Sequence, residues 1–165
     1  MSSWAARSRE EANLLNPPFC SLLLILAAEH YQRASKDGLP YVYPFLILPL
    51  LLHKATRERL PKTTLKSLST WIEENPTLRA LLPDNVRSLR PFVQEALLYA
   101  LVHGCLRVDD EGGFLLGKKP RGLSGYETGS SDEVRDCLKK SQFVGRWLAT
   151  AGSVPTVMAL WGIRP

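Results

Sequence analysis

The sequence contains few of the side chains that build reactive or metal-binding sites. Its 165 residues include three cysteines, at positions 20, 105 and 137, and three histidines, at 30, 53 and 103. The cysteines form neither a CxxC pair nor an even disulfide set. All three fall on faces that we expect to be buried, so reduced and inert thiols are the simplest interpretation. The histidines are too far apart for a local metal motif, and we predict no metal and no cofactor.

The sequence also lacks the common motifs of nucleotide-binding and hydrolytic enzymes. The patterns GxxxxGK[ST], GxGxxG, HExxH and GxSxG are all absent. Acidic residues do occur as neighbours, at 73–74 and 109–111, but adjacent side chains point apart on a helix or at a hairpin tip. We therefore predict that the protein is not an enzyme.

No apolar run is long enough to cross a membrane. The runs at 19–28 and 41–52 both fall well short of the roughly 20 residues that a spanning helix needs. Each is followed at once by charged side chains, so we interpret both as buried core helices. With no signal peptide recognised either, we expect a cytoplasmic protein.

The composition is that of an ordinary globular protein, with 45% hydrophobic and 22% charged residues and a formal net charge of +5. At this length we expect one domain at 16–165 after an N-terminal arm at 1–15. We divide this domain into a helical core at 16–60, helices plus a wing at 61–120, and C-terminal helices at 130–165.

Capping residues and apolar spacing predict a mainly α fold. Asn16, followed by two prolines, begins a helix at about 19–35. Ser130 and Ser131 begin a long helix whose buried stripe includes Trp147. The other predicted elements are a helix at 40–59 that Pro49 kinks or splits, helices at 63–75, 77–82, 86–103 and 153–160, and a loop at 121–131.

A β-hairpin is predicted directly after three of these helices. Residues 105–117 carry alternating apolar and polar side chains and a glycine pair at the turn. Three helices followed by a two-stranded wing is the order of a winged helix, whose third helix can enter a DNA major groove. We therefore predict a helical domain with a winged-helix-like helix–helix–helix–β-hairpin module.

Positive charge near this module suggests contacts with DNA phosphates. Lysine and arginine outnumber acidic residues between 53 and 91, and another basic run follows the hairpin. The hairpin tip at 109–111 is acidic, however, and would repel a phosphate backbone. Protein docking and DNA contact therefore both stay open, with docking favoured. The candidate DNA-phosphate contacts are Lys54, Arg57, Lys62, Lys118, Lys119 and Arg121.

Exposed apolar side chains would provide a docking surface for a partner protein. Residues 153–165 hold too many apolar groups for a solvated tail, and tryptophan and arginine are frequent interface anchors. The alternative is that this segment closes the domain's own core. The candidate partner contacts are Tyr41, Tyr43, Trp161, Ile163 and Arg164.

Several segments, by their order and spacing, carry a resemblance to a known family. They are NPPFC at 16–20, GLP at 38–40, FLILPLLLHK at 45–54, LP at 60–61, WIEENP at 71–76, RPF at 90–92, VGRWLA at 144–149 and LWGIRP at 160–165. Together they resemble the middle component of bacterial ABC-type three-component systems. The best-known members look like the small C subunit of the Lamassu anti-phage systems.

The resemblance implies a non-catalytic accessory subunit of an SMC/Rad50-like ABC ATPase complex. Such a subunit bridges the ATPase to an effector, commonly a nuclease, and the assembly senses foreign DNA. The alternative is a stand-alone winged-helix transcriptional regulator, which should form a homodimer. The family offers no catalytic residue, and the positions that match its motifs are core or docking candidates: Pro18, Pro49, His53, Lys54, Gly145, Arg146 and Trp147.

Overall fold

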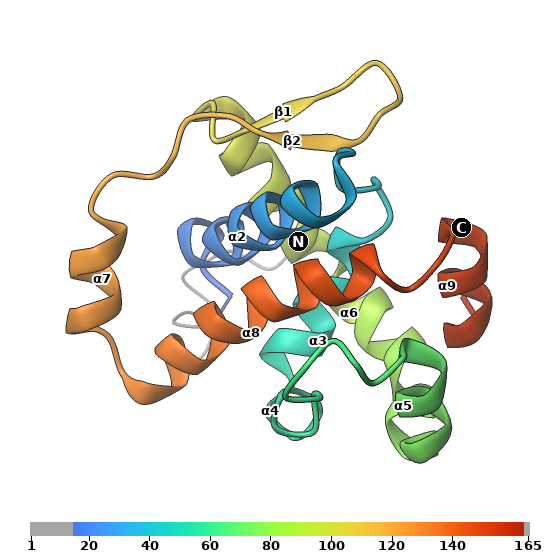
Figure 1. Ribbon diagram of the computed structural model, residues 1–165. Coiled ribbons are helices and arrows are strands. Elements are labelled where there is room, and N and C mark those ends of the chain that lie inside the picture. The colour runs from blue at the N-terminus through green and yellow to red at the C-terminus, as the bar shows by residue number, and fades with distance from the viewer. Residues whose placement is uncertain (1–14, 164–165) are drawn as a thin grey trace.

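The computed structural model describes residues 15–163 of the chain (Figure 1). Within this range the chain is mainly helical with a two-stranded antiparallel sheet, which confirms the predicted helical domain with a hairpin. Residues 1–14 of the predicted arm and the candidate Arg164 lie outside the described residues. The elements are α2 (Pro17–Ser35), α3 (Pro44–Leu52), α4 (Lys54–Glu58), α5 (Leu68–Glu74), α6 (Pro76–Val102), β1 (Leu106–Val108), β2 (Phe114–Leu116), α7 (Leu123–Gly129), α8 (Asp132–Ala149) and α9 (Val154–Trp161). The winged-helix part of the prediction is not confirmed, because two helices, α5 and α6, and not three precede the hairpin after residue 61.

Helix α2 begins where the sequence predicts. The Asn16 Oδ1 atom accepts the N–H of Phe19 at 2.8 Å, and the two prolines after Asn16 occupy the first turn. Proline is tolerated there because the N–H groups of the first turn have no acceptor within the helix, so their absence costs no hydrogen bond. The helix ends before Lys36, which adopts the left-handed conformation with φ 71°.

Helix α8 packs closely along α2 (Figure 1). Gly145 permits this approach, because a Cβ atom there would lie 2.3 Å from the carbonyl oxygen of Ala27 in α2. The Ser131 hydroxyl accepts the N–H of Val134 at 3.3 Å and caps α8 as predicted. The predicted buried stripe is also confirmed, with Trp147 only 1% exposed.

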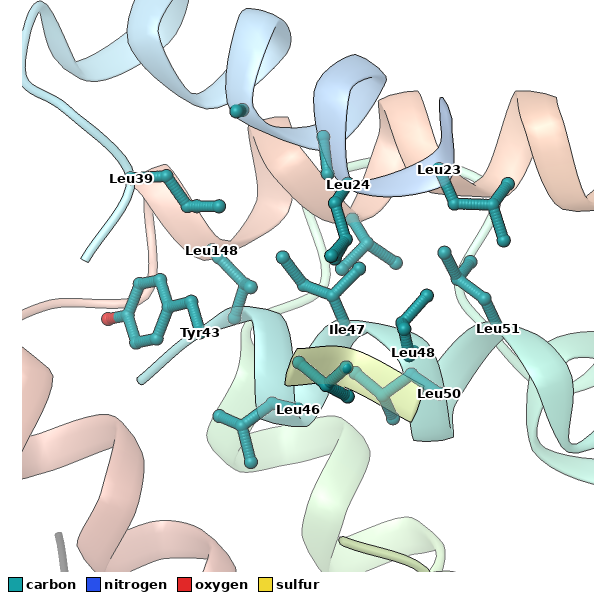
Figure 2. Packing of buried hydrophobic residues seen from close by; sticks show 14 of the residues in the cluster. Leu23, Leu24, Leu39, Tyr43, Leu46, Ile47, Leu48, Leu50, Leu51 and Leu148 are labelled. Atoms are coloured by element: carbon teal, nitrogen blue, oxygen red, sulfur yellow. The ribbon is translucent and has the colours of Figure 1, made fainter. Parts of the chain in front are cut away.

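Helix α3 is enclosed by other elements, as expected for a helix that is apolar on every side. Figure 2 shows Ile47 in one buried cluster with Leu24 of α2 and Leu148 of α8. The break in this segment comes later than predicted, because Pro49 stays inside α3 and the chain leaves the helix at His53. Proline removes only one helical hydrogen bond, and burial of the leucines after it sustains another turn. Within residues 15–163, no helix combines the length and apolar character that a membrane crossing requires.

Helix α6 corrects the prediction of two separate helices at 77–82 and 86–103. Pro83 lies inside this one helix, although the sequence predicts a break there. The turn before Pro83 is held by the buried side chains of Leu78 and Leu82. Their burial offsets the hydrogen bond that the proline removes.

Two further segments differ from the prediction. The helix predicted at 63–75 begins only at Leu68, where the Ser67 hydroxyl accepts the N–H of Thr70 at 3.2 Å. Residues 123–129, predicted to lie in a loop, form α7. Glycine and serine lower the helix propensity of this stretch, but local hydrogen bonds close a short helix, with the Tyr126 N–H donating to the carbonyl oxygen of Gly122 at 2.9 Å.

The predicted hairpin is confirmed, with Val108 of β1 opposite Phe114 of β2. Gly112 in its turn adopts φ 83°, a conformation that favours glycine. The main chains of Leu39 and Phe114 exchange two hydrogen bonds of 2.8 Å. These bonds tie the hairpin to the segment before α3 and bring Tyr41 beside it.

Candidate functional site

The described residues contain little reactive chemistry. No group of His, Cys, Asp and Glu suited to a metal ion occurs within residues 15–163. Cys20 and Cys137 are buried as predicted, whereas Cys105 is partly exposed. Burial raises the pKa of Cys137 to about 11 despite the nearby Arg57. A thiol with that pKa is protonated at neutral pH and is a poor nucleophile.

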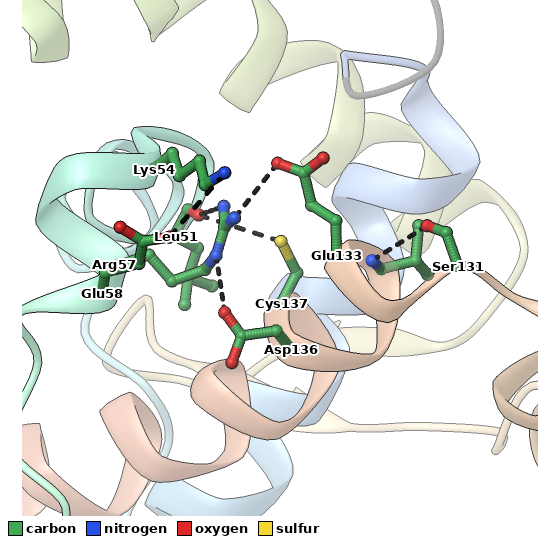
Figure 3. Close-up of polar contacts among 9 residues, drawn as sticks. Leu51, Lys54, Arg57, Glu58, Ser131, Glu133, Asp136 and Cys137 are labelled. Carbon is green, nitrogen blue, oxygen red and sulfur yellow. Dashed lines mark hydrogen bonds and ion pairs between the residues drawn. The ribbon is translucent and has the colours of Figure 1, made fainter.

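Arg57, predicted to contact DNA phosphates, is instead buried between α4 and α8 (Figure 3). Its Nε donates to Asp136 Oδ2 at 2.9 Å, and its Nη2 donates to Glu133 Oε1 at 3.1 Å. Its Nη1 donates to the carbonyl oxygen of Leu51 at 2.7 Å. The side chain is 2% exposed, so it cannot reach a phosphate, and this assignment is corrected.

The other predicted phosphate contacts are exposed but lie on different sides of the molecule. Lys54, which approaches Glu58 at 3.8 Å, and Lys62 lie in or near α4 and α5. Figure 1 shows these helices at the opposite end from the hairpin, which is followed by Lys118, Lys119 and Arg121. The structure therefore does not gather the predicted residues into one surface.

A basic cluster forms instead around the nearly buried carboxylate of Glu29. Glu29 Oε1 lies 2.6 Å from Arg33 Nη2 and 3.1 Å from Lys119 Nζ. The Nη1 atom of Arg146 lies 3.0 Å from the Nδ1 atom of His30. We call His30, Arg33, Lys119 and Arg146 the basic cluster. It joins α2, α8 and the segment after β2, and its three cations outnumber the one carboxylate.

The imidazole of His30 responds to these surroundings. Its pKa is lowered from the ordinary value, first by burial and then by the positive charge of Arg146. A neutral imidazole can accept a hydrogen bond from the Arg146 guanidinium. Sequence reasoning missed His30 and Arg33, because residues far apart in the sequence meet here. The sequence signals were Arg146, which lies in the VGRWLA segment, and Lys119, which is one of the predicted phosphate contacts.

Two of the predicted partner contacts are buried in the domain itself. Tyr43 is 0% exposed and Trp161 is 2% exposed, so neither side chain is available on the surface. Burial raises the pKa of Tyr43 to about 12. The ring of Trp161 packs 5.9 Å from that of Trp71. The expectation of exposed anchors is corrected for both residues. Trp161 is buried because α9 packs its apolar face against the domain's own core, and the Tyr43 ring lies inside that core, edge-on to the ring of Tyr31 at 5.8 Å. Ile163 is half-buried.

Tyr41, in contrast, is exposed and borders an apolar groove between α6 and the hairpin. The groove has a volume of about 510 Å³. Leu98 is 63% exposed, and Val108 and Tyr41 are each 56% exposed. We call this surface the apolar groove; its apolar lining consists of Tyr41, Leu97, Leu98, Leu101, Val108 and Phe114.

Sequence reasoning identified Tyr41 but missed Leu98 and Val108. The apolar spacing of this helix predicts a buried face that includes Val93, Leu97 and Leu101 and leaves Leu98 off it, but the pattern does not show that Leu98 borders a groove. In the structure Leu97 is 6% exposed and Leu98 faces outward. Val108 occupies an apolar position of the alternating strand, as Leu106 does. Whether such a position is buried depends on which other elements cover β1, and the sequence does not show this.

The polar edge of the apolar groove is acidic. Glu111 at the hairpin tip lines the groove directly. Asp110 lines an adjoining hollow that also includes Tyr41. Both acidic side chains are exposed, so negative charge lies beside the exposed side chains of Tyr41, Leu98 and Val108.

Comparison with protein-family models adds a finding that covers almost the whole chain. The model described as ABC-three component (ABC-3C) system Middle Component 3 matches residues 4–165. A comparison with curated proteins and one with solved structures found no match. The matched residues include the apolar groove and the basic cluster.

Proposed function

The chain belongs to the family of middle components of ABC-three component systems, and from this premise we propose that it is a non-catalytic adaptor subunit. In this proposal it bridges an SMC/Rad50-like ABC ATPase to a nuclease-type effector in the cytoplasm. Like the Lamassu C subunit that it resembles, it helps the assembly to sense foreign DNA. An adaptor needs surfaces that bind other components and no catalytic residues of its own.

The exposed apolar groove is the observation that carries this proposal. Exposed apolar patches on a folded domain mark sites of protein contact. The Tyr41 ring is held 5.7 Å from the ring of Phe45 and 6.0 Å from that of Phe114. A ring fixed in this way loses little conformational freedom on binding, which favours its use as an interface anchor.

Leu98→Asp is expected to weaken binding of the other components at least about tenfold. The change removes a leucine contact of about 1.5 kcal/mol and places a charge in the interface. The matched control is Leu65→Asp, because Leu65 is 93% exposed and lies before α5. The measurement is co-purification and Kd with the ATPase and the effector, alongside the melting temperature. Unchanged binding by a folded Leu98→Asp protein would contradict the proposal.

The basic cluster supports a phosphate contact within the assembled complex. Arg33, Lys119 and Arg146 present two guanidinium groups and one ammonium group from three elements. Each neutralised phosphate releases counterions and steepens the salt dependence of binding. We propose that DNA passes this side of the molecule and not the side of Lys54 and Lys62.

Replacing Lys118, Lys119 and Arg121 with glutamine is expected to reduce the salt dependence of duplex binding by the complex. The slope of log K against log salt should fall by up to about three, near 0.9 for each lost phosphate contact. Adding Arg146→Gln should reduce it further. The control is Lys54→Gln with Lys62→Gln, which should leave the slope as it is. Equal slopes for all these proteins would remove the basic cluster from the DNA-facing surface.

A stand-alone DNA-binding regulator is the second candidate, and the basic cluster beside a helix–hairpin arrangement is the observation in its favour. Such a regulator should be a symmetric dimer that binds duplex DNA without other components. The acidic hairpin tip opposes this candidate, since a wing that follows DNA would meet phosphates. Sedimentation of the chain alone and a duplex titration distinguish the two functions.

A further inference from the structure

We propose that the apolar groove binds a segment of a partner protein in which apolar side chains are flanked by lysine or arginine. The apolar side chains would enter the groove, and the cations would pair with the acidic hairpin tip. This inference rests on the proposed adaptor function, because it names the chemistry of the segment that the groove receives.

The acidic tip is the first observation behind this inference. Within residues 15–163, neither Asp110 nor Glu111 has an ion-pair partner, and both are exposed. Several other surface acids are paired, such as Glu74, whose Oε2 lies 2.5 Å from Lys66 Nζ, and Asp84, whose Oδ1 lies 3.2 Å from Arg87 Nη1. Within the described part of the chain, the tip differs from single unpaired acids such as Glu73 in holding two adjacent free carboxylates beside an apolar groove. A local pair of free carboxylates on a chain with net charge +5 marks a surface suited to a cationic partner.

The tip is also held in one conformation before any partner arrives. Asp109 Oδ1 accepts the N–H of Glu111 at 2.9 Å and the N–H of Gly113 at 2.8 Å. The other carboxylate oxygen of Asp109, Oδ2, lies close to Gly38. A Cβ atom at position 38 would be only 2.5 Å from this oxygen, so glycine there leaves room for the Asp109 side chain. Asp109 therefore stabilises the hairpin, while Asp110 and Glu111 remain available for a partner.

The groove and the tip form one continuous surface. Glu111 and Gly112 line the groove together with Leu98 and Val108. A segment that covers the apolar floor therefore passes within reach of the acidic tip. Nucleic acid does not fit this surface, because its phosphates would face carboxylates over an apolar floor. A segment that is apolar and acidic would be repelled at the tip.

The test measures binding of the ATPase and the effector to the full chain at several salt concentrations. The double variant Asp110→Lys with Glu111→Lys reverses the charge of the hairpin tip and keeps Asp109, which stabilises the hairpin. The control, Glu58→Lys with Glu73→Lys, makes the same charge change on α4 and α5 at the opposite end of the molecule (Figure 1). We expect the tip variant to slow association about tenfold at low salt and to reverse its salt dependence, because salt then screens a repulsion between like charges, with the control near wild type.

The outcomes separate this inference from the adaptor function. If Leu98→Asp abolishes binding while the tip variant binds like wild type, the adaptor function stands and the inference is wrong. If neither variant affects binding, the groove is not the docking site and both fail. If the chain alone forms a dimer that Leu98→Asp disrupts, with binding of the other components unchanged, the groove receives a second copy and the inference is also wrong.

A peptide measurement identifies the segment itself. Overlapping 15-residue peptides that cover the sequences of the ATPase and the effector provide the probes. We expect the bound peptides to place lysine or arginine beside apolar residues, and to lose binding when those cations are replaced by glutamate. Selection of acidic or uncharged peptides would overturn the inference.

Discussion

Trp147→Ala is expected to lower the free energy of unfolding by about 3–5 kcal/mol, a large part of the stability of a domain this size. The indole is 1% exposed and meets the ring of Trp71 edge-on at 5.4 Å. It also stacks on Phe143 at 5.5 Å, and its Nε1 donates to the carbonyl oxygen of Lys66 at 2.8 Å. Truncation leaves a cavity between the rings of Trp71 and Phe143 and an unpaired carbonyl group. Urea unfolding followed by tryptophan fluorescence measures the change.

Two companion substitutions separate these contributions. Trp147→Phe keeps an aromatic ring but loses the hydrogen bond to Lys66, so it should cost clearly less than Trp147→Ala. Leu65→Ala removes an exposed side chain and should change stability by no more than about 0.5 kcal/mol. An unfolding curve for Trp147→Ala that overlies that of the wild type would show that the α5–α8 contact contributes little.

Arg57→Ala is expected to cost about 3 kcal/mol of stability. The guanidinium is 2% exposed and supplies hydrogen bonds to Asp136, Glu133 and the carbonyl oxygen of Leu51 (Figure 3). The two carboxylates are 40% and 47% exposed, so water can solvate them after the change. The cost therefore comes mainly from the buried Leu51 carbonyl, the lost charge-assisted bonds and the cavity.

Arg57→Lys and Arg57→Met show which of these terms dominates. Lysine keeps the positive charge but lacks the planar guanidinium that reaches Asp136, Glu133 and the Leu51 carbonyl together. Arg57→Lys should therefore be more stable than Arg57→Ala but less stable than the wild type. Methionine fills the volume without any donor. If Arg57→Met restores the wild-type melting temperature, packing and not the ion pairs accounts for the role of Arg57.

Local features of the fold followed directly from the sequence. Asn16 and Ser131 were predicted to begin helices, and both side chains accept the expected backbone N–H groups. The hairpin was predicted from its alternation and its glycine turn, and the register places Val108 opposite Phe114. A cap or a tight turn depends on interactions within a few residues, so the sequence contains the whole of its cause.

The extent of the helices depended on more distant contacts. Pro83 predicted a break, yet α6 passes through it because Leu78 and Leu82 are buried against the rest of the domain. Propensity and proline signals are worth only a few kcal/mol at most, and tertiary burial can exceed them.

The candidate site divides in the same way. The sequence alone determined a mainly helical domain with a hairpin, a basic net charge and an acidic hairpin tip. Only the tertiary structure decided that Arg57 and Trp161 are buried, that Leu98 borders a groove beside the hairpin, and that Arg146 meets His30. Composition and spacing show which interactions each side chain can make. The burial of a side chain and the charged groups near it depend on residues that are distant in the sequence. Those neighbours decide whether an arginine binds a phosphate or stabilises a core, and whether a leucine packs inside or offers a docking surface.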